Sequence, residues 1–283
     1  MIISWRMILF VVMLFVVSCA DQPKKQEAST PPIESADIAD PGYDFSRAEV
    51  VTLKKKLREI SGIAALEDGK LAAVQDESGI IYILDEKSGE VLNTIDFAGK
   101  GDYEDIAVNA EYYFVLESSG IIYRVPRSGT ANVDSYTLGG KKKKEFESLY
   151  LDRNKLVLIC KACGKDDRSK DAYCFDLQKL EFESSTCLGI ELNAVLQKMP
   201  AGTLLKPSAA AINSIDQKLY VLCSVGKVLL KCSKAGAVEQ IIPLDAKIFR
   251  QPEGICFKSD GTLFISNEGA GLDATLVKIP FNK

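Results

Sequence analysis

Tyr103-Glu-Asp-Ile-Ala107 is one of five copies of a short motif that recurs along this chain. Every copy carries a serine or a glutamate at its second position, and successive second positions are separated by 43, 43, 61 and 45 residues. The other copies are Ile60-Ser-Gly-Ile-Ala64, Phe146-Glu-Ser-Leu-Tyr150, Pro207-Ser-Ala-Ala-Ala211 and Pro252-Glu-Gly-Ile-Cys256. A repeat of this period indicates a protein that is built from copies of one supersecondary unit.

Each copy is followed by the same order of short β-rich segments. A turn such as Asp68-Gly69 comes first and a second apolar run follows it. The third run reads Ser78-Gly-Ile-Ile-Tyr-Ile83 in one unit and Ser119-Gly-Ile-Ile-Tyr-Arg124 in the next. With a fourth run, as in 91–97, four short strands fill one repeat, which has the length of a propeller blade. We therefore predict an all-β, five-bladed β-propeller of four-stranded antiparallel blades.

Two irregularities in the repeat refine this prediction. The interval between Glu147 and Ser208 is longer than the others, which leaves a six-bladed propeller as the alternative, but the excess is less than half a blade. Apolar residues on one face of 190–199 predict a short inserted helix in that interval. The last unit stops after its third strand, so we expect the strand-like residues 48–53 to supply its outer strand and close the ring.

The N-terminal region reads as an export signal. Arg6 precedes an apolar run at 7–17 that is too short to span a bilayer. Small residues precede Cys19 in a pattern that resembles the bacterial lipobox, which predicts lipidation of Cys19 with palmitate-type chains and attachment to a membrane of the cell envelope. An ordinary signal peptide or an uncleaved anchor is the alternative. The predicted divisions of the chain are a signal peptide at 1–18, a polar, proline-rich disordered tether at 19–45 and the propeller at 46–283.

The composition excludes several kinds of chemistry. The 283 residues include no histidine, so Ser-His-Asp catalysis, Cys-His catalysis and histidine metal sites are all excluded. The net charge of −4 argues against general binding of nucleic acid. Acid–base chemistry in this chain has to rely on carboxylates, lysine or tyrosine.

Six of the eight cysteines fall into two groups. Cys160, Cys163 and Cys174 form the only cluster, and in an exported chain they favour a disulfide whose pairing the sequence leaves open. The other group lies inside apolar runs and is expected in the core; it consists of Cys223, Cys232 and Cys256. A zinc site would need a second pair of cysteines at suitable spacing, and the chain has none.

Three stretches carry a resemblance to a known family: Glu59-Ile-Ser-Gly-Ile63, Gly101-Asp-Tyr-Glu-Asp-Ile-Ala107 and Gln251-Pro-Glu-Gly-Ile255. Together with the order Ser, Glu, Glu, Ser, Glu at the aligned second positions, they resemble the SdiA-regulated family of bacterial envelope proteins over residues 50–281. The family name refers to gene regulation and implies no reaction. More distantly the chain is similar to calcium-binding propeller lactonases and phytase-like esterases, but it lacks the histidines that some of those use.

The motif also predicts a site. In a propeller the first strands line the central channel, so Glu104, Glu147 and Glu253 should converge there, with Ser61 and Ser208 between them. Close carboxylates repel one another, and a bound cation relieves the repulsion. Oxygen-only ligands suit calcium or magnesium, so we predict a metal site with calcium as its cofactor. The structural alternative is that each glutamate accepts hydrogen bonds from the backbone of a neighbouring blade.

Two further sets of polar residues are expected around this ring. Asp76, Glu117 and Asn267 end second strands and are predicted to form an outer ring of ligand-binding residues. The loops that enter the first strands are basic, and a basic rim around an acidic centre attracts an anion that also ligates a metal. The basic residues are 54–56, Arg58, Lys100, 141–144, Lys206, Lys247 and Arg250, of which Lys143, Lys206 and Arg250 are predicted to contact the ligand. The alternative is that these charges are simply solvated.

Three functions fit these features. The first is a membrane-tethered binding module that holds a small anion or an envelope component at the channel mouth, together with a divalent cation. The second is a calcium-dependent hydrolase of an ester, lactone or phosphoester, in which the metal polarises the substrate and a carboxylate activates water. The third is a scaffold for another envelope protein. The fold alone cannot choose among them.

Overall fold

The computed structural model describes residues 42–129, 132–140, 144–163 and 168–282. The chain divides into two units, Met1–Thr30 and Pro31–Lys283, and every described residue lies in the second. The predicted signal peptide, Cys19 and Lys143 lie outside the described residues. Within the described ranges, no helix is long and apolar enough to cross a bilayer.

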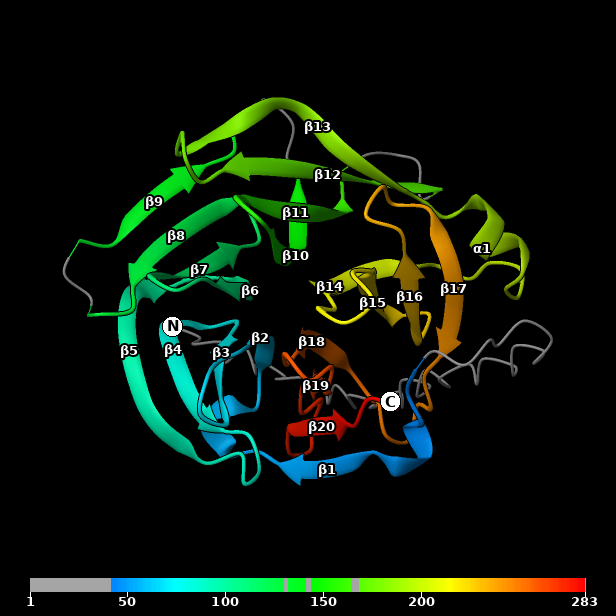
Figure 1. Ribbon diagram of the computed structural model, residues 1–283, viewed down its shortest axis with the longest axis horizontal. Helices are drawn as coiled ribbons and strands as arrows, with labels where there is room; N and C mark the ends of the chain where they lie inside the picture. The colour runs from blue at the N-terminus through cyan, green and yellow to red at the C-terminus, as the bar shows by residue number, and fades with distance from the viewer. Residues whose placement is uncertain (1–41, 130–131, 141–143, 164–167, 283) are drawn as a thin grey trace, which may run out of the picture. The chain divides into compact units, whose positions relative to one another are not determined.

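The chain folds into five four-stranded antiparallel sheets, which are arranged as blades around a central axis (Figure 1). From the inner to the outer strand, blade 1 consists of β2 (Ile60–Ala65), β3 (Lys70–Gln75), β4 (Ser78–Asp85) and β5 (Val91–Lys100), and blade 2 consists of β6 (Tyr103–Val108), β7 (Tyr112–Glu117), β8 (Ile121–Pro126) and β9 (Asp134–Thr137). Blade 3 consists of β10 (Glu145–Asp152), β11 (Lys155–Ala162), β12 (Ser169–Asp176) and β13 (Glu181–Glu191), and blade 4 consists of β14 (Lys206–Ile212), β15 (Leu219–Val225), β16 (Val228–Cys232) and β17 (Val238–Pro243). Blade 5 consists of β18 (Pro252–Phe257), β19 (Leu263–Asn267), β20 (Thr275–Ile279) and β1 (Glu49–Thr52). The five-bladed prediction is confirmed, and the six-bladed alternative is excluded.

The ring is closed by pairing between the two ends of the domain. Strand β1 is the outer strand of blade 5 and pairs antiparallel with β20, and Figure 1 shows the two side by side. The described residues include a segment that precedes β1. Tyr43 is buried, forms a bridge with Phe281 and donates a 2.7 Å hydrogen bond to the carbonyl of Gly261. The predicted tether therefore ends earlier than residue 45, because Tyr43 packs into the core.

The long interval between blades 3 and 4 contains the predicted helix. It is α1 (Asn193–Gln197), which is shorter than predicted because residues 190 and 191 belong to β13. Two short 3-10 helices precede blade 1, at Phe45–Arg47 and Lys55–Leu57. The second of these brings a basic segment to the start of β2.

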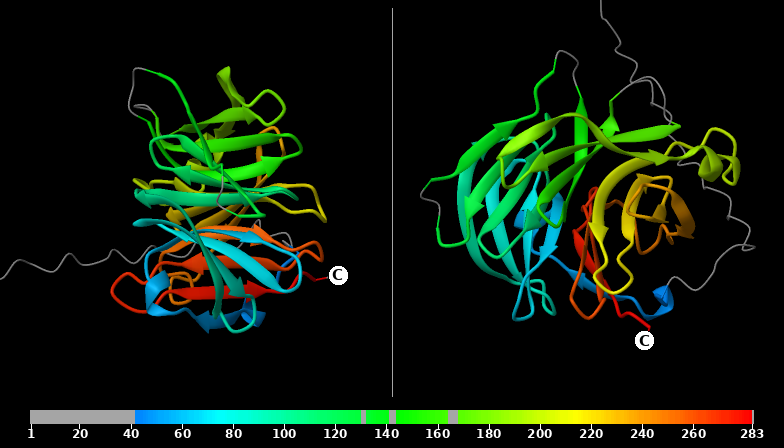
Figure 2. Two further views of the ribbon diagram at one scale, coloured as in Figure 1. Left: turned by 90° about the vertical axis from the view of Figure 1, so that its left-hand side faces the viewer. Right: turned by 45° about the horizontal axis from the view of Figure 1, so that its top comes forward.

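The core consists of five apolar clusters, one at each junction between neighbouring blades. Strand β7 illustrates how the sequence builds them. Tyr113 and Val115 pack into the cluster shared with blade 1, whereas Phe114 and Leu116 pack into the cluster shared with blade 3. Successive side chains of a strand point to opposite faces, so a strand with apolar residues on both faces fits between two blades. Figure 2 shows the blades from two other directions.

Each first strand contains a β-bulge at the second position of the motif. In blade 2, Tyr103 pairs with Glu117 and Asp105 pairs with Leu116, so Glu104 has no cross-strand partner. The same break in register occurs at Ser61, Glu147, Ser208 and Glu253. A bulge bends the strand and re-aims the extra side chain. The recurrent motif therefore marks one structural device that the fold repeats five times.

Candidate functional site

The three motif glutamates surround a lysine that the sequence analysis did not identify. Lys161, near the end of β11, forms an ion pair with Glu147, and its Nζ lies 3.2 Å from Glu145 Oε1. Burial raises the pKa of Glu104 and of Glu253, which lie on blades 2 and 5, and the positive charge of Lys161 opposes that rise at both. These interactions involve residues of blades 2, 3 and 5 at the start of their first strands and at the end of β11.

Burial keeps two of these glutamates from ionising normally. Desolvation, together with the charge of Asp102, raises the pKa of Glu104 to about 8. Desolvation also raises the pKa of Glu253, although a 3.1 Å hydrogen bond from Ser224 Oγ and the charge of Lys161 act in the opposite direction. Burial thus outweighs the attraction of Lys161 at both glutamates, and it favours their protonated forms.

A second pair of carboxyl groups extends the cluster towards blades 1 and 5. Desolvation, with the charges of Glu59 and Glu77, raises the pKa of Asp76 to about 6. Desolvation and a hydrogen bond with Glu59 raise the pKa of Glu268 to about 7, and Gln251 Nε2 also donates a hydrogen bond to Glu268. Asp76 Oδ1 is covered from solvent and has no hydrogen-bond partner among the described residues. We call Asp76, Glu104, Glu253 and Glu268 the carboxyl cluster.

These contacts involve one equivalent position at the end of the second strand of each blade. It follows the residue that pairs with the start of the motif, and it is occupied by Asp76, Ser118, Lys161, Ser224 and Glu268. Ser118 donates a 2.5 Å hydrogen bond to Asp102, and the other four make the contacts described above. The structure thus has a second polar ring, and four of its five members were missing from the predicted one.

The predicted outer ring combined two different registers. Asp76 belongs to the second ring, but Glu117 and Asn267 lie one position earlier in their strands. Glu117 accepts a 3.1 Å hydrogen bond from Tyr123, and the buried Asn267 donates to the carbonyl of Ile248 and to Thr275 Oγ1. A shift of one residue turns a side chain to the other face of the sheet, so these two residues do not join Asp76.

The two serines of the motif connect blades. Ser61 Oγ donates a 2.7 Å hydrogen bond to the carbonyl of Tyr103, at the start of the next blade. Ser208 Oγ donates a 2.9 Å hydrogen bond to the carbonyl of Pro252 in the same way. Both side chains are buried, so their described contacts bind neighbouring first strands together.

The described cysteines form two disulfides. Cys160 is bonded to Cys163, and Cys174 is bonded to Cys187, which joins β12 to β13. Cys187 was not among the cysteines singled out in the sequence. Its partner becomes apparent only when the two outer strands of blade 3 are placed side by side. Cys223, Cys232 and Cys256 are unpaired and buried, as expected for core residues.

The side chains are not arranged as a preassembled metal cage. Among the described residues, the only group of three or more Cys, Asp or Glu side chains with ligand atoms within 4.8 Å of one another is Cys174, Glu183 and Cys187. Both of those cysteines are in a disulfide. At the channel mouth, Lys161 already provides a positive charge to the glutamates. A divalent cation there requires side-chain movement, and calcium remains a prediction.

The five blades, the bulged first strands and the carboxyl groups at the channel mouth place this chain in the class of β-propeller proteins. The chain belongs to the SdiA-regulated family, whose model matches residues 37–271. A comparison with curated proteins finds no match.

Solved structures confirm the fold. A glutaminyl cyclase from Myxococcus xanthus is similar with a TM-score of 0.58 and 12% identity, over 82% of this chain and 95% of that chain. A luciferin-regenerating enzyme has a TM-score of 0.51 and 10% identity over 82% and 95% of the two chains. A streptogramin B lyase has a TM-score of 0.50 and 11% identity over 82% and 97%. At these identities the likeness concerns the fold alone.

The raised pKa values predict how stability depends on pH. Between about pH 5 and pH 8 the folded protein retains protons on Asp76, Glu104 and Glu268 that the unfolded chain has released, so stability should fall as the pH rises. Glu104→Gln cannot ionise, and because the pKa of Glu104 is the highest of the three it should remove about half of the decrease in Tm over this range. Thermal unfolding at several pH values measures this effect. Glu111→Gln, an exposed change in the same blade, should leave the pH dependence unchanged.

Proposed function

We propose that this protein is an exported, lipid-anchored binding module that holds a small anion or an anionic envelope component at the channel mouth, with a divalent cation between the ligand and the carboxyl cluster. The observation that carries this proposal is the carboxyl cluster itself. Its members lie on blades 1, 2 and 5, and all have raised pKa values. Perturbed carboxyl groups that converge in one place are typical of functional sites.

The charges around the cluster determine the kind of ligand. The carboxyl groups favour a cation, whereas the entry loops at the same end carry basic residues such as Lys206 and Arg250. A ligand with a negative group and an associated divalent cation satisfies both regions. Calcium is the ion expected for oxygen ligands, and it would take the place of the protons on the cluster.

The proposed location rests on two features. The lipobox-like sequence before Cys19 is one, although it lies outside the described residues. The two disulfides are the other, since disulfides persist mainly in oxidising compartments outside the cytoplasm. Replacing Cys19 with alanine should release the protein from the membrane fraction, and continued membrane association would contradict the proposed anchor.

Calcium titration tests the cation. Calcium at about a hundredfold excess over its Kd should stabilise the wild-type protein by about 2.7 kcal/mol at pH 8, whereas sodium chloride of equal ionic strength should not. Glu268→Gln removes a charge from the cluster and should weaken calcium binding, measured by calorimetry. Exposed Glu111→Gln serves as the matched control. Equal Tm values in calcium and in sodium chloride would exclude the cation.

A hydrolase is the second candidate, and one observation favours it. Glu268 and Glu59 share a hydrogen bond, and the pKa of Glu268 is about 7, which suits a general acid or base near neutral pH. The similar structures described above are those of enzymes, but at 10–12% identity the likeness carries no argument about activity. A panel of esters, lactones and phosphoesters tests this candidate. Turnover that Glu268→Gln abolishes would support it, and no turnover by the wild-type protein would reject it.

A further inference from the structure

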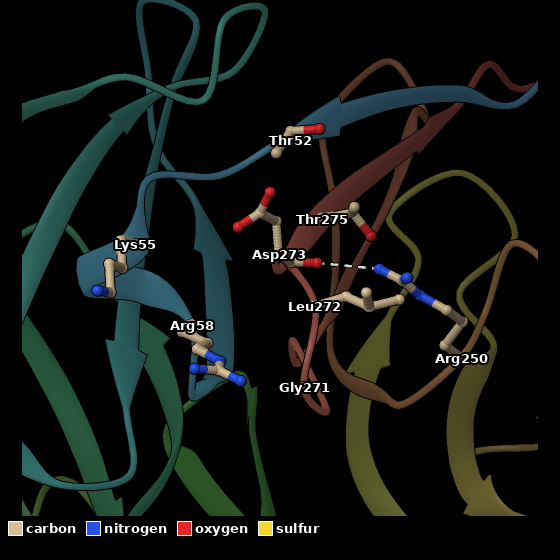
Figure 3. A pocket seen from close by; sticks show the side chains of 8 residues that line it. All are labelled: Thr52, Lys55, Arg58, Arg250, Gly271, Leu272, Asp273 and Thr275. Carbon is tan, nitrogen blue, oxygen red and sulfur yellow. Dashed lines mark hydrogen bonds between the residues drawn. The ribbon is translucent and has the colours of Figure 1, made fainter.

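A pocket of about 490 Å³ lies between blades 5 and 1, on the side of the domain where the first strands begin (Figure 3). Its lining comes from three separate segments: the end of β1 with the following 3-10 helix, the loop before β18, and the loop between β19 and β20. The lining residues are Thr52, Lys55, Arg58, Arg250, Gly271, Leu272, Asp273 and Thr275. A pocket of this size suits a small organic molecule.

The three lysines at 54–56 have different surroundings. Lys54 Nζ lies 3.4 Å from Glu90, and Lys56 Nζ lies 5.6 Å from the ring centre of Tyr82. Lys55 lines the pocket, and it forms no ion pair within the part of the chain that the structure describes. The run of lysines therefore supplies one uncompensated positive charge to this pocket.

The two arginines also keep hydrogen-bonding capacity. Arg250 Nη2 donates a 2.9 Å hydrogen bond to the backbone carbonyl of Asp273, and no described carboxylate pairs with Arg250. Arg58 Nε is covered from solvent and makes no hydrogen bond, and its ion pair with Glu59 spans 3.9 Å. In Figure 3, Lys55 and Arg58 lie on one side of the pocket and Arg250 lies on the other. Arg58 and Arg250 therefore face the pocket from two sides, and since Nε of Arg58 is covered, its terminal guanidinium nitrogens are the atoms that can reach an oxyanion.

A hydroxyl group completes the lining. Thr275 Oγ1 accepts a 3.0 Å hydrogen bond from Asn267 Nδ2, so its own proton remains available to a ligand. Asn267 Nδ2 also donates to the carbonyl of Ile248, in the loop that carries Arg250. Asn267, predicted from the sequence to bind ligand, thus acts as a positioning residue for two parts of the pocket.

We infer that this pocket binds the doubly charged oxyanion of a small phosphate monoester, with Lys55, Arg58 and Arg250 as its charged ligands. Three cationic side chains line the pocket against the single carboxylate of Asp273, and although Glu59 partly compensates Arg58, the pocket keeps a net positive charge that favours a dianion over a monoanion. Leu272 is 60% exposed at this pocket and offers an apolar contact for the rest of the molecule. The inference rests on the proposed binding function and specifies the place and charge of the ligand's anionic group.

Calorimetric titration without calcium, at constant ionic strength, tests the inference with inorganic phosphate and glucose 6-phosphate as probes. Lys55→Gln and Arg250→Gln should each weaken glucose 6-phosphate binding about tenfold. Lys54→Gln removes the same charge from the adjacent residue, outside the pocket, and should leave the affinity unchanged. Glucuronate, with a single negative charge, should bind more weakly than glucose 6-phosphate. The exposed Lys55 can be replaced with little effect on folding, so its result stands even if Arg250→Gln is unstable.

Three results would overturn the inference. They are no binding of either phosphate probe by the wild-type protein, equal loss of affinity in Lys54→Gln and Lys55→Gln, and tighter binding of glucuronate. Glu104→Gln separates this inference from the proposed function, because it changes the channel mouth only. If phosphate binding fails in Glu104→Gln but survives in Lys55→Gln, the anion binds at the carboxyl cluster, and the pocket is wrong while the binding module remains.

Discussion

Lys161→Met should lower the Tm by about 6–12 °C at pH 8, and by much less at pH 5. Lys161 is paired with Glu147, and its side chain is only 25% exposed. Removing one partner of a largely buried pair leaves an uncompensated charge, at a cost of about 3 kcal/mol, which corresponds to such a shift in a domain of this size. At pH 5 a pKa of about 8 keeps Glu104 protonated, and the raised pKa of Glu253 acts in the same direction, so less negative charge is left without a partner.

The same strand offers a matched control for this prediction. Lys155 in β11 pairs with Glu183, but both side chains are substantially exposed. Lys155→Met should change the Tm by no more than about 2–4 °C, because an exposed pair contributes less than about 1 kcal/mol. Thermal unfolding of both variants at pH 5 and pH 8 makes the comparison. Equal destabilisation of Lys161→Met at the two pH values would show that the lysine does not neutralise the glutamates.

Asp105→Ala should lower the Tm by about 8–16 °C, because it removes a buried connection between blades 2 and 3. Asp105 Oδ1 accepts a 2.8 Å hydrogen bond from the N–H of Ile106, and Oδ2 accepts a 2.7 Å bond from the N–H of Leu149 in the next blade. Asp105 is 2% exposed, so water cannot replace either bond in a well-packed variant. Two unsatisfied buried N–H groups cost on the order of 4 kcal/mol together.

Asp85 provides the corresponding control in an exposed turn. Its Oδ1 accepts hydrogen bonds from the N–H groups of Lys87 and Ser88 at 3.1 and 2.8 Å. Water can satisfy those groups after Asp85→Ala, so that variant should lose less than about 1 kcal/mol. Asp105→Asn keeps one acceptor and should fall between wild type and Asp105→Ala. If Asp105→Ala unfolds at the wild-type temperature, the carboxyl group does not connect the blades.

The fold could be predicted because its period is present in local sequence. Each blade needs four short strands with apolar side chains on both faces, so the apolar runs and turns recur at nearly constant spacing. The motif glutamates could be predicted for the same reason, since equivalent positions of a repeat occupy equivalent places around the axis. The missing outer strand of blade 5 was predictable because β20 needed a partner, which β1 supplies.

The rest of the site depends on the register between paired strands, which the sequence of a single strand does not reveal. The bulges shift the register by one residue in each first strand, so it was not apparent that Asp76 and Glu268 share a ring while Glu117 and Asn267 lie outside it. Lys161 stood out only as a residue between two cysteines. Its role follows from the pairing of β10 with β11, which places it beside Glu147.

A double-mutant cycle between Lys161 and Glu253 tests most directly whether side chains from different blades meet at the channel mouth. The cycle uses Lys161→Met, Glu253→Gln and the double variant, with unfolding free energies measured at pH 8. We expect a coupling energy of at least about 0.5 kcal/mol, because the charge of Lys161 opposes the burial-driven rise in the pKa of Glu253 although 92 residues separate them in the sequence. If the loss of unfolding free energy in the double variant equals the sum of the losses in Lys161→Met and Glu253→Gln within about 0.3 kcal/mol, the convergence on which the proposed site depends is contradicted.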